Sequence, residues 1–252
     1  MKKFILITLF LITSASWANT RFCNASRSPD FTATALSSSK NRLSFTNRGG
    51  LLGGGVCWWH SRFTRNAIYK ARFNPEAKTA SEEETKDIIK AIRKGKNVIA
   101  IDGYKNLKEF SRINEELIQK ELESWQRYDG FIRQQWIVGL WGWHRLPASK
   151  MKARVEHLYD YVKKQGNIAY LKLQIKGITA HSWLVTDMQK MSDGYDLKII
   201  DSNYHYPIAY RYRYGDRSFE TPSYGDVVPY LGKIKENQRN KNIRSSYCRA
   251  RP

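Results

Sequence analysis

The sequence has few cysteines, few acidic residues and no long apolar run after its first residues, and each shortage narrows what the protein can be. Only 3 of its 252 residues are cysteine, and an odd number leaves at least one thiol unpaired or shared with another molecule. No segment after Ala18 approaches the roughly 20 apolar residues that a membrane-spanning helix needs. Paired metal fingers and aromatic RNA-binding motifs are also missing, which argues against a specific nucleic-acid partner.

The first 18 residues have the order of a secretory signal peptide. Lys2 and Lys3 precede an apolar run over residues 4–12, and small residues lead to Ala18, after which we expect cleavage. The apolar run is too short to span a bilayer comfortably, so a retained membrane anchor is the less favoured alternative. We therefore expect an exported protein, periplasmic or secreted, without a transmembrane anchor in its mature form. Residues 19–252 are expected to form a single domain.

Basic residues outnumber acidic residues by 43 to 23, which gives a formal charge of +20. Cleavage after Ala18 removes Lys2 and Lys3, so the mature chain keeps +18 of this charge. Such a charge favours anionic partners, among them an anionic component of the cell envelope. Because the basic residues are spread along the chain, the alternative is that they form an ordinary solvated surface and bind no anionic partner. We expect no cofactor.

The three cysteines differ in position. Cys23 lies near the mature N-terminus and Cys248 near the C-terminus, whereas Cys57 lies between a glycine-rich segment and an aromatic run. Because the two ends of a domain are often close in space, we expect a disulfide between Cys23 and Cys248. Cys57 is then the unpaired thiol.

Apolar spacing predicts helices in the first part of the chain and strands in the second. Residues 19–48 are expected to be extended. Helices are expected over residues 57–72, from a capping box at Ser81 to Gly95, over residues 110–125, and over residues 151–162 with a stop at Gly166. Strands are expected over residues 97–102, 167–175, 180–186 and 195–201, with a weaker one over 204–214. Residues 233–252 are predicted to be a basic tail. This order indicates one α+β domain, with an antiparallel sheet in its second part.

Cys57 follows five glycines within residues 49–55 and opens the first predicted helix. At a helix start the thiol lies among unsatisfied N–H groups at the positive end of the helix dipole, and both favour the thiolate. The glycines would let backbone N–H groups face an oxyanion. On this segment alone, Cys57 could equally be a small buried hydrophobic residue without a catalytic role.

A nucleophilic cysteine needs a base and a group that orients the base, and His181 and Asp201 are the best candidates. If Asp187 opposes Tyr195 in a hairpin through residues 188–194, Asp201 falls opposite His181 on the same face, because strand side chains alternate. A slip of two residues would place Asn203 there instead. His60, one helical turn after Cys57, and His205, after the third late strand, are alternative bases.

The segments "GGGVCWW", "AHSWLV" and "LKIIDSN" together resemble the papain-like superfamily of thiol enzymes, which includes transglutaminase-like proteins. The resemblance covers residues 49–63 and 178–204. It implies an α+β fold with Cys57 as nucleophile, His181 as base and Asp201 as orienting residue. The papain glutamine that donates to the oxyanion is replaced here by Leu51, so Asn47 or the backbone would take that role. Asn203 is a second orienting candidate, and Trp58, His60, Trp183 and His205 are candidates for the cleft.

We therefore expect a cysteine peptidase or amidase that acts on a protein or peptide-like amide through a thiolate and an acyl-enzyme. One alternative is transglutaminase-like acyl transfer, and another is a basic envelope-binding module on the same fold without catalysis. A third alternative is a metal site with Cys57, His60 and His181 as ligands, for which Cys-x-x-His alone is weak support.

Overall fold

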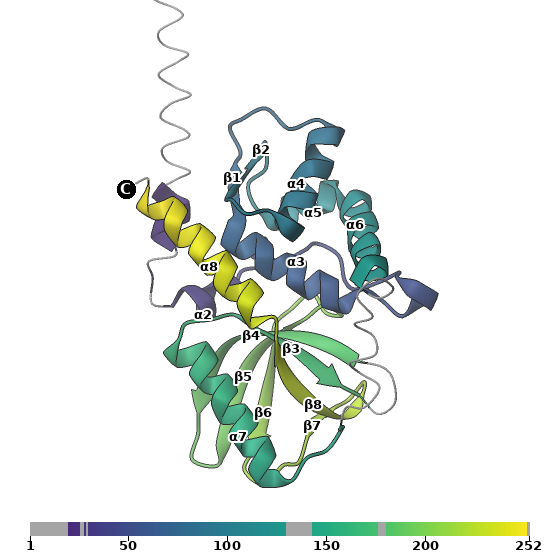
Figure 1. Ribbon diagram of the computed structural model, residues 1–252, viewed down its shortest axis with the longest axis vertical. Helices are drawn as coiled ribbons and strands as arrows, with labels where there is room; N and C mark the ends of the chain where they lie inside the picture. Colours follow the sequence, from purple (N-terminus) through teal and green to yellow (C-terminus); the bar gives the residue numbers. More distant parts are fainter. Residues whose placement is uncertain (1–19, 26–27, 29, 130–142, 176–179, 251–252) are drawn as a thin grey trace, which may run out of the picture.

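The computed structural model describes residues 20–25, 28, 30–129, 143–175 and 180–250 and has a mixed α+β architecture (Figure 1). Its helices include α2 (Phe31–Ala35), α3 (Cys57–Lys70), α4 (Glu82–Lys94), α5 (Leu107–Ile113), α6 (Glu115–Arg127), α7 (Ala148–Tyr159) and α8 (Ile234–Arg249), with short 3-10 helices η1 (Ser39–Asn41) and η2 (Leu51–Gly53) and a π-helix η5 (Asp160–Lys164). The proposed signal peptide lies outside the described residues. Within them, no helix is long and apolar enough to cross a membrane.

Six antiparallel strands form the main sheet, in the order β6-β5-β4-β3-β8-β7. Their bounds are β3 (Ala169–Gln174), β4 (Ala180–Lys190), β5 (Gly194–Asp201), β6 (Ile208–Arg213), β7 (Phe219–Thr221) and β8 (Gly225–Gly232). Strands β1 (Ala71–Asn74) and β2 (Ile99–Asp102) form a separate parallel pair. The predicted α+β class with a late antiparallel sheet is therefore confirmed.

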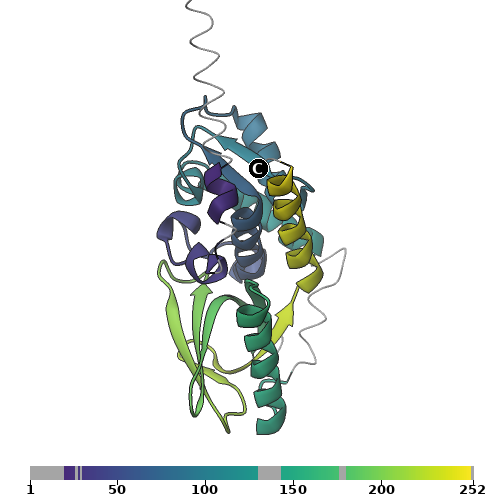
Figure 2. The same ribbon diagram turned by 90° about the vertical axis from the view of Figure 1, so that its left-hand side faces the viewer.

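The sheet is covered on both faces. Helix α7 and η5 pack on one face, over a core that includes Leu171, Trp183 and Leu197 (Figures 1 and 2). The other face carries Tyr170, Leu184 and Ile200 and packs against α2 and α3. Because side chains alternate along a strand, odd-numbered residues at the start of β4 face α7 and even-numbered ones face α3. Helix α3 thus lies between the sheet and the core of α4, α5 and α6.

The helical part follows its local signals closely. Ser81 caps α4 by accepting from the Glu84 N–H, the Glu84 side chain accepts from the Ser81 N–H, and Gly95 ends the helix. The single helix predicted over residues 110–125 is wrong, because the chain breaks it at Asn114 into α5 and α6. Asn114 donates to the Phe110 carbonyl and to the Tyr104 hydroxyl, bonds that compete with a continuous helix.

The prediction of a tail over residues 233–252 is wrong for residues 234–249. They form α8, which packs beside α3, and Cys248 near its end forms the predicted disulfide with Cys23. The helix was missed because its buried face is polar rather than apolar: Asn237 and Asn240 are fully buried and hydrogen-bonded to other asparagines. Apolar periodicity gives no signal for such a face.

The β4–β5 hairpin differs from the predicted register. Strand β4 continues to Lys190, which opposes Tyr195. This extension includes Met188, whose buried side chain belongs to the core. A bulge between Val185 and Asp187 then sets Trp183, not His181, opposite Asp201. At the end of the hairpin that carries Asp201, the observed pairing differs from the predicted one by two residues. Because this shift is even, the side chains of His181 and Asp201 still lie on the same face of the sheet.

Candidate functional site

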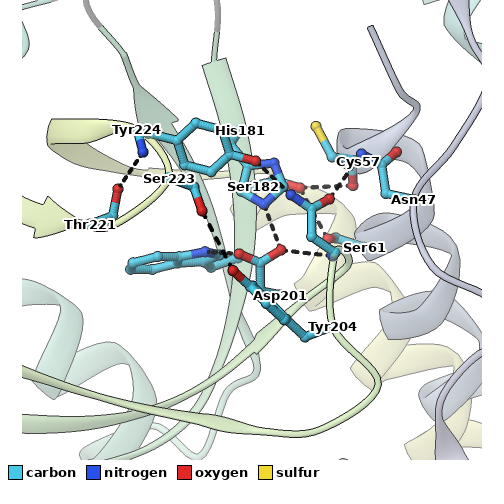
Figure 3. A network of polar contacts seen from close by, with 12 residues as sticks. Asn47, Cys57, Ser61, His181, Ser182, Asp201, Tyr204, Thr221, Ser223 and Tyr224 are labelled. Atoms are coloured by element: carbon cyan, nitrogen blue, oxygen red, sulfur yellow. Dashed lines mark hydrogen bonds and ion pairs between the residues drawn. The ribbon is translucent and has the colours of Figure 1, made fainter. Parts of the chain in front are cut away.

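Three elements meet at one end of the sheet: the first turn of α3, the start of β4 and the end of β5 (Figure 3). They carry Cys57, His181 and Asp201 respectively, and all three side chains are at least nine-tenths buried. His181 and Asp201, which lie 124 and 144 positions after Cys57 in the sequence, thus meet it at the junction between the helical part and the sheet. The structure brings together the three residues proposed from the sequence.

Cys57 is the first residue of α3 and the one cysteine outside the disulfide. Its Sγ lies 3.9 Å from the Ala180 carbonyl oxygen, which also accepts from Trp58 Nε1 at 3.1 Å. The buried hydroxyl of Ser182 donates to the Cys57 carbonyl at 2.8 Å and contacts Ser61 Oγ. Strand β4 therefore fixes the first turn of α3 at several points. The N–H groups of Cys57 and Trp58 come before the first helical hydrogen bonds, in which Trp59 and His60 donate to the Val56 carbonyl.

His181 and Asp201 form a close pair, with Nε2 2.7 Å from Oδ1. The pair is diagonal across the strands rather than directly opposed, within the reach of such neighbours. Trp183 Nε1 donates to the other oxygen of Asp201 at 2.8 Å, and the Asn203 N–H donates to Oδ1 at 2.9 Å. Because Nε2 is engaged by Asp201, Nδ1 is the imidazole nitrogen left for the hydrogen bond with Cys57.

The charge state of the pair follows from these contacts. Burial lowers the pKa of His181, but hydrogen bonds with Asp201 and Cys57 outweigh it and raise the pKa to about 9. Burial alone would raise the pKa of Asp201, yet the bonds from His181, Asn203 and Trp183 hold it below its usual value. At neutral pH the site therefore holds an imidazolium between the Asp201 carboxylate and the sulfur of Cys57.

Asn47 and Asn203 line the approach to Cys57 and are bonded to each other. Asn47 Oδ1 accepts from the Val56 N–H at 2.6 Å, and its Nδ2 donates to Asn203 Oδ1 at 3.1 Å. A Cβ on Gly55 would lie 2.5 Å from Asn47 Nδ2, so this approach requires glycine, whose φ here is +78°. Of the two orienting candidates, Asp201 contacts His181 and Asn203 supports Asp201 through its backbone.

The remaining candidates have other surroundings. His60 is buried with Nε2 3.0 Å from the Phe45 carbonyl, and burial lowers the pKa of His60 to about 4. Trp183 packs in the core on the α7 face, Trp58 is half-buried beside Ala180, and His205 is exposed on the loop after β5. Among the described residues, no three His, Cys, Asp or Glu side chains cluster as metal ligands, and His60 Nε2 contacts the Phe45 carbonyl instead of the Cys57–His181 pair.

Sequence reasoning missed Tyr224, which is close to the imidazole. Its ring lies 4.9 Å from that of His181 at an interplanar angle of 33°, and its hydroxyl accepts from Asn203 Nδ2 at 2.6 Å. Tyr224 lies in the turn between β7 and β8, both of which were also missed because neither has a clear alternation. Compared with protein-family models, with curated proteins and with solved structures, the chain matches none.

Proposed function

We propose that the chain is an exported cysteine hydrolase of papain-like type, a peptidase or amidase that works through an acyl-enzyme on Cys57. The observation that carries the proposal is the position of the His181 imidazole, hydrogen-bonded to Asp201 through Nε2 and to Cys57. A nucleophile, a base and a group that orients the base are the parts that this chemistry requires. The Cys23–Cys248 disulfide supports export, because disulfides persist in oxidising compartments.

The proposed reaction begins with the thiolate of Cys57 attacking the carbonyl carbon of an amide. The imidazolium of His181 gives its Nδ1 proton to the leaving nitrogen, and the C–N bond breaks to leave a thioester. His181 then takes a proton from water, which attacks the thioester, and the S–C bond breaks to release the acid and the thiolate. The N–H of Cys57 and the second Nδ2 hydrogen of Asn47 are the donors that we assign to the oxyanion.

A peptide-digestion experiment tests this function. The wild-type chain should produce new carboxyl termini in a mixed peptide library at neutral pH, read by mass spectrometry, and Cys57→Ala should produce none. His205→Ala is the matched control, because His205 is exposed outside the triad, and it should cleave like the wild type. Wild-type and Cys57→Ala digests with the same products would contradict the proposal, as would a wild-type digest without products.

A further inference from the structure

Lys172 lies beside the residue that follows the proposed nucleophile. Its Nζ is 3.7 Å from the centroid of the Trp58 ring. On β3 it pairs with Ser182, whose hydroxyl bonds the Cys57 carbonyl. Opposed side chains of an antiparallel pair share a face, so Lys172 projects on the side of the sheet where α3 begins.

The charge of Lys172 has no acidic counterpart. Every Asp and Glu of the chain belongs to the described residues, and none of them pairs with Lys172 there. Glu236 of the adjacent helix α8 is engaged by Arg62 and Arg65 instead. Burial and the charge of Lys233 lower the pKa of Lys172 to about 8, against a smaller raising effect of Cys57. The fold thus keeps a half-buried ammonium close to a second cation and to Cys57, an arrangement whose cost a bound anion would reduce.

Lys233, the second cation, has an unusual backbone. With φ at 53° it is the one non-glycine residue among the described ones with positive φ. Left-handed backbone in a lysine costs free energy, and such residues concentrate at functional sites. The strained backbone therefore adjoins the half-buried charge of Lys172.

We propose that Lys172, with the face of Trp58 and the charge of Lys233, forms a carboxylate-binding subsite beside Cys57. The inference rests on the proposed function and deepens it, because it assigns the substrate a carboxylate near the amide that Cys57 attacks. The ammonium of Lys172 supplies the charge, and the indole face supplies a flat apolar surface for the carbon chain that bears the carboxylate.

Two small reagents of the same reactivity class test the subsite without a known substrate. Iodoacetate and iodoacetamide both alkylate Cys57 with loss of iodide and differ in carrying a carboxylate or a carboxamide. The quantity compared is the second-order rate constant for iodoacetate divided by that for iodoacetamide, each followed by intact mass at neutral pH without reductant. This ratio should be about fivefold lower in Lys172→Met than in the wild type, which is the upper end for the effect of one partly screened charge. Lys172→Arg should keep the ratio, because it keeps the charge.

The matched control is Lys190→Met, which removes an exposed charge at the far end of β4 and should leave the ratio unchanged. The His181 charge is present in every variant and cancels in the comparison. An unchanged ratio in folded Lys172→Met overturns the subsite and leaves the proposed function standing. Slow alkylation by both reagents in the wild type overturns the proposed function instead. If Lys172→Met does not fold, the wild-type ratio must fall as sodium chloride is raised, and a constant ratio overturns the subsite.

Discussion

Replacing His181 by alanine should slow the alkylation of Cys57 by iodoacetamide at pH 6 by about 100-fold, within the range for loss of a positioned acid–base group. The reason is electrostatic. In the wild type the pKa of His181 is raised to about 9, so an imidazolium stands beside the sulfur throughout the neutral range. Without it, a negative charge on the Cys57 sulfur keeps only the first turn of α3 as a stabilising partner, so less thiolate is available to react at pH 6.

The pH profile separates this effect from a loss of structure. Wild-type alkylation should stay high from pH 6 to pH 8, where His181 is protonated, whereas the alkylation of His181→Ala should rise with pH over this range. His205→Ala keeps the site intact and should retain the wild-type profile. Equal rates for wild type and His181→Ala at pH 6, in variants with the same circular dichroism, would show that the imidazole does not act on the sulfur.

Replacing Glu236 by alanine should lower the free energy of unfolding by about 3–5 kcal/mol, the usual cost of breaking a buried ion pair. Glu236 accepts from Arg62 at 2.6 Å and from Arg65 at 2.8 Å, and the side chain of Arg65 is 0% exposed. Arg62 keeps Asp129 as a partner at 2.8 Å, but Arg65 loses its carboxylate and stays buried. Because α3 presents Cys57 and α8 carries Glu236, this ion pair also fixes the helix that holds the site.

Urea unfolding at pH 7 measures this cost, with Glu156→Ala as the matched control. Glu156 forms an exposed pair with Lys152, and its removal should cost less than about 1 kcal/mol. The two arginines hold the pKa of Glu236 at about 2 despite its burial, so the folded-state value is depressed. This contribution is therefore complete above the unfolded carboxyl pKa and is lost as the pH falls toward 2. A cost below about 1 kcal/mol for Glu236→Ala would contradict the role that we assign to the ion pair.

The parts of the site that could be predicted are those with a local signal. Cys57 follows a glycine-rich segment and opens a helical pattern, and His181 and Asp201 lie at the ends of two strongly apolar strands. The pairing of these strands was predicted with an error of three residues at the turn, because residues 188–190 extend β4, and a bulge reduces the error to two residues at the site. Since an even shift preserves the face of each side chain, the proposed pair still met.

The parts that could not be predicted depend on contacts distant in sequence. Helix α8 buries asparagine and arginine, and its partners on α3 lie more than 170 residues away. Tyr224 reaches the imidazole from a turn between two short strands, and Lys172 was counted only as one residue of an apolar strand. Such positions become visible only when the sheet order and the packing of α3 are known.

The central claim, that Cys57 is an activated nucleophile, is tested most directly by acylation with p-nitrophenyl acetate at pH 7. Intact-mass and peptide measurements should find one acetyl group on Cys57 of the folded wild type, formed in a burst and then lost to water as the thioester hydrolyses. The same chain unfolded in urea, with its disulfide intact, supplies the reference reactivity of the same thiol. We predict acylation of the folded chain at least tenfold faster than this reference, as expected for a paired thiolate. Acylation of Cys57 at the unfolded rate, or of lysines alone, would contradict the account.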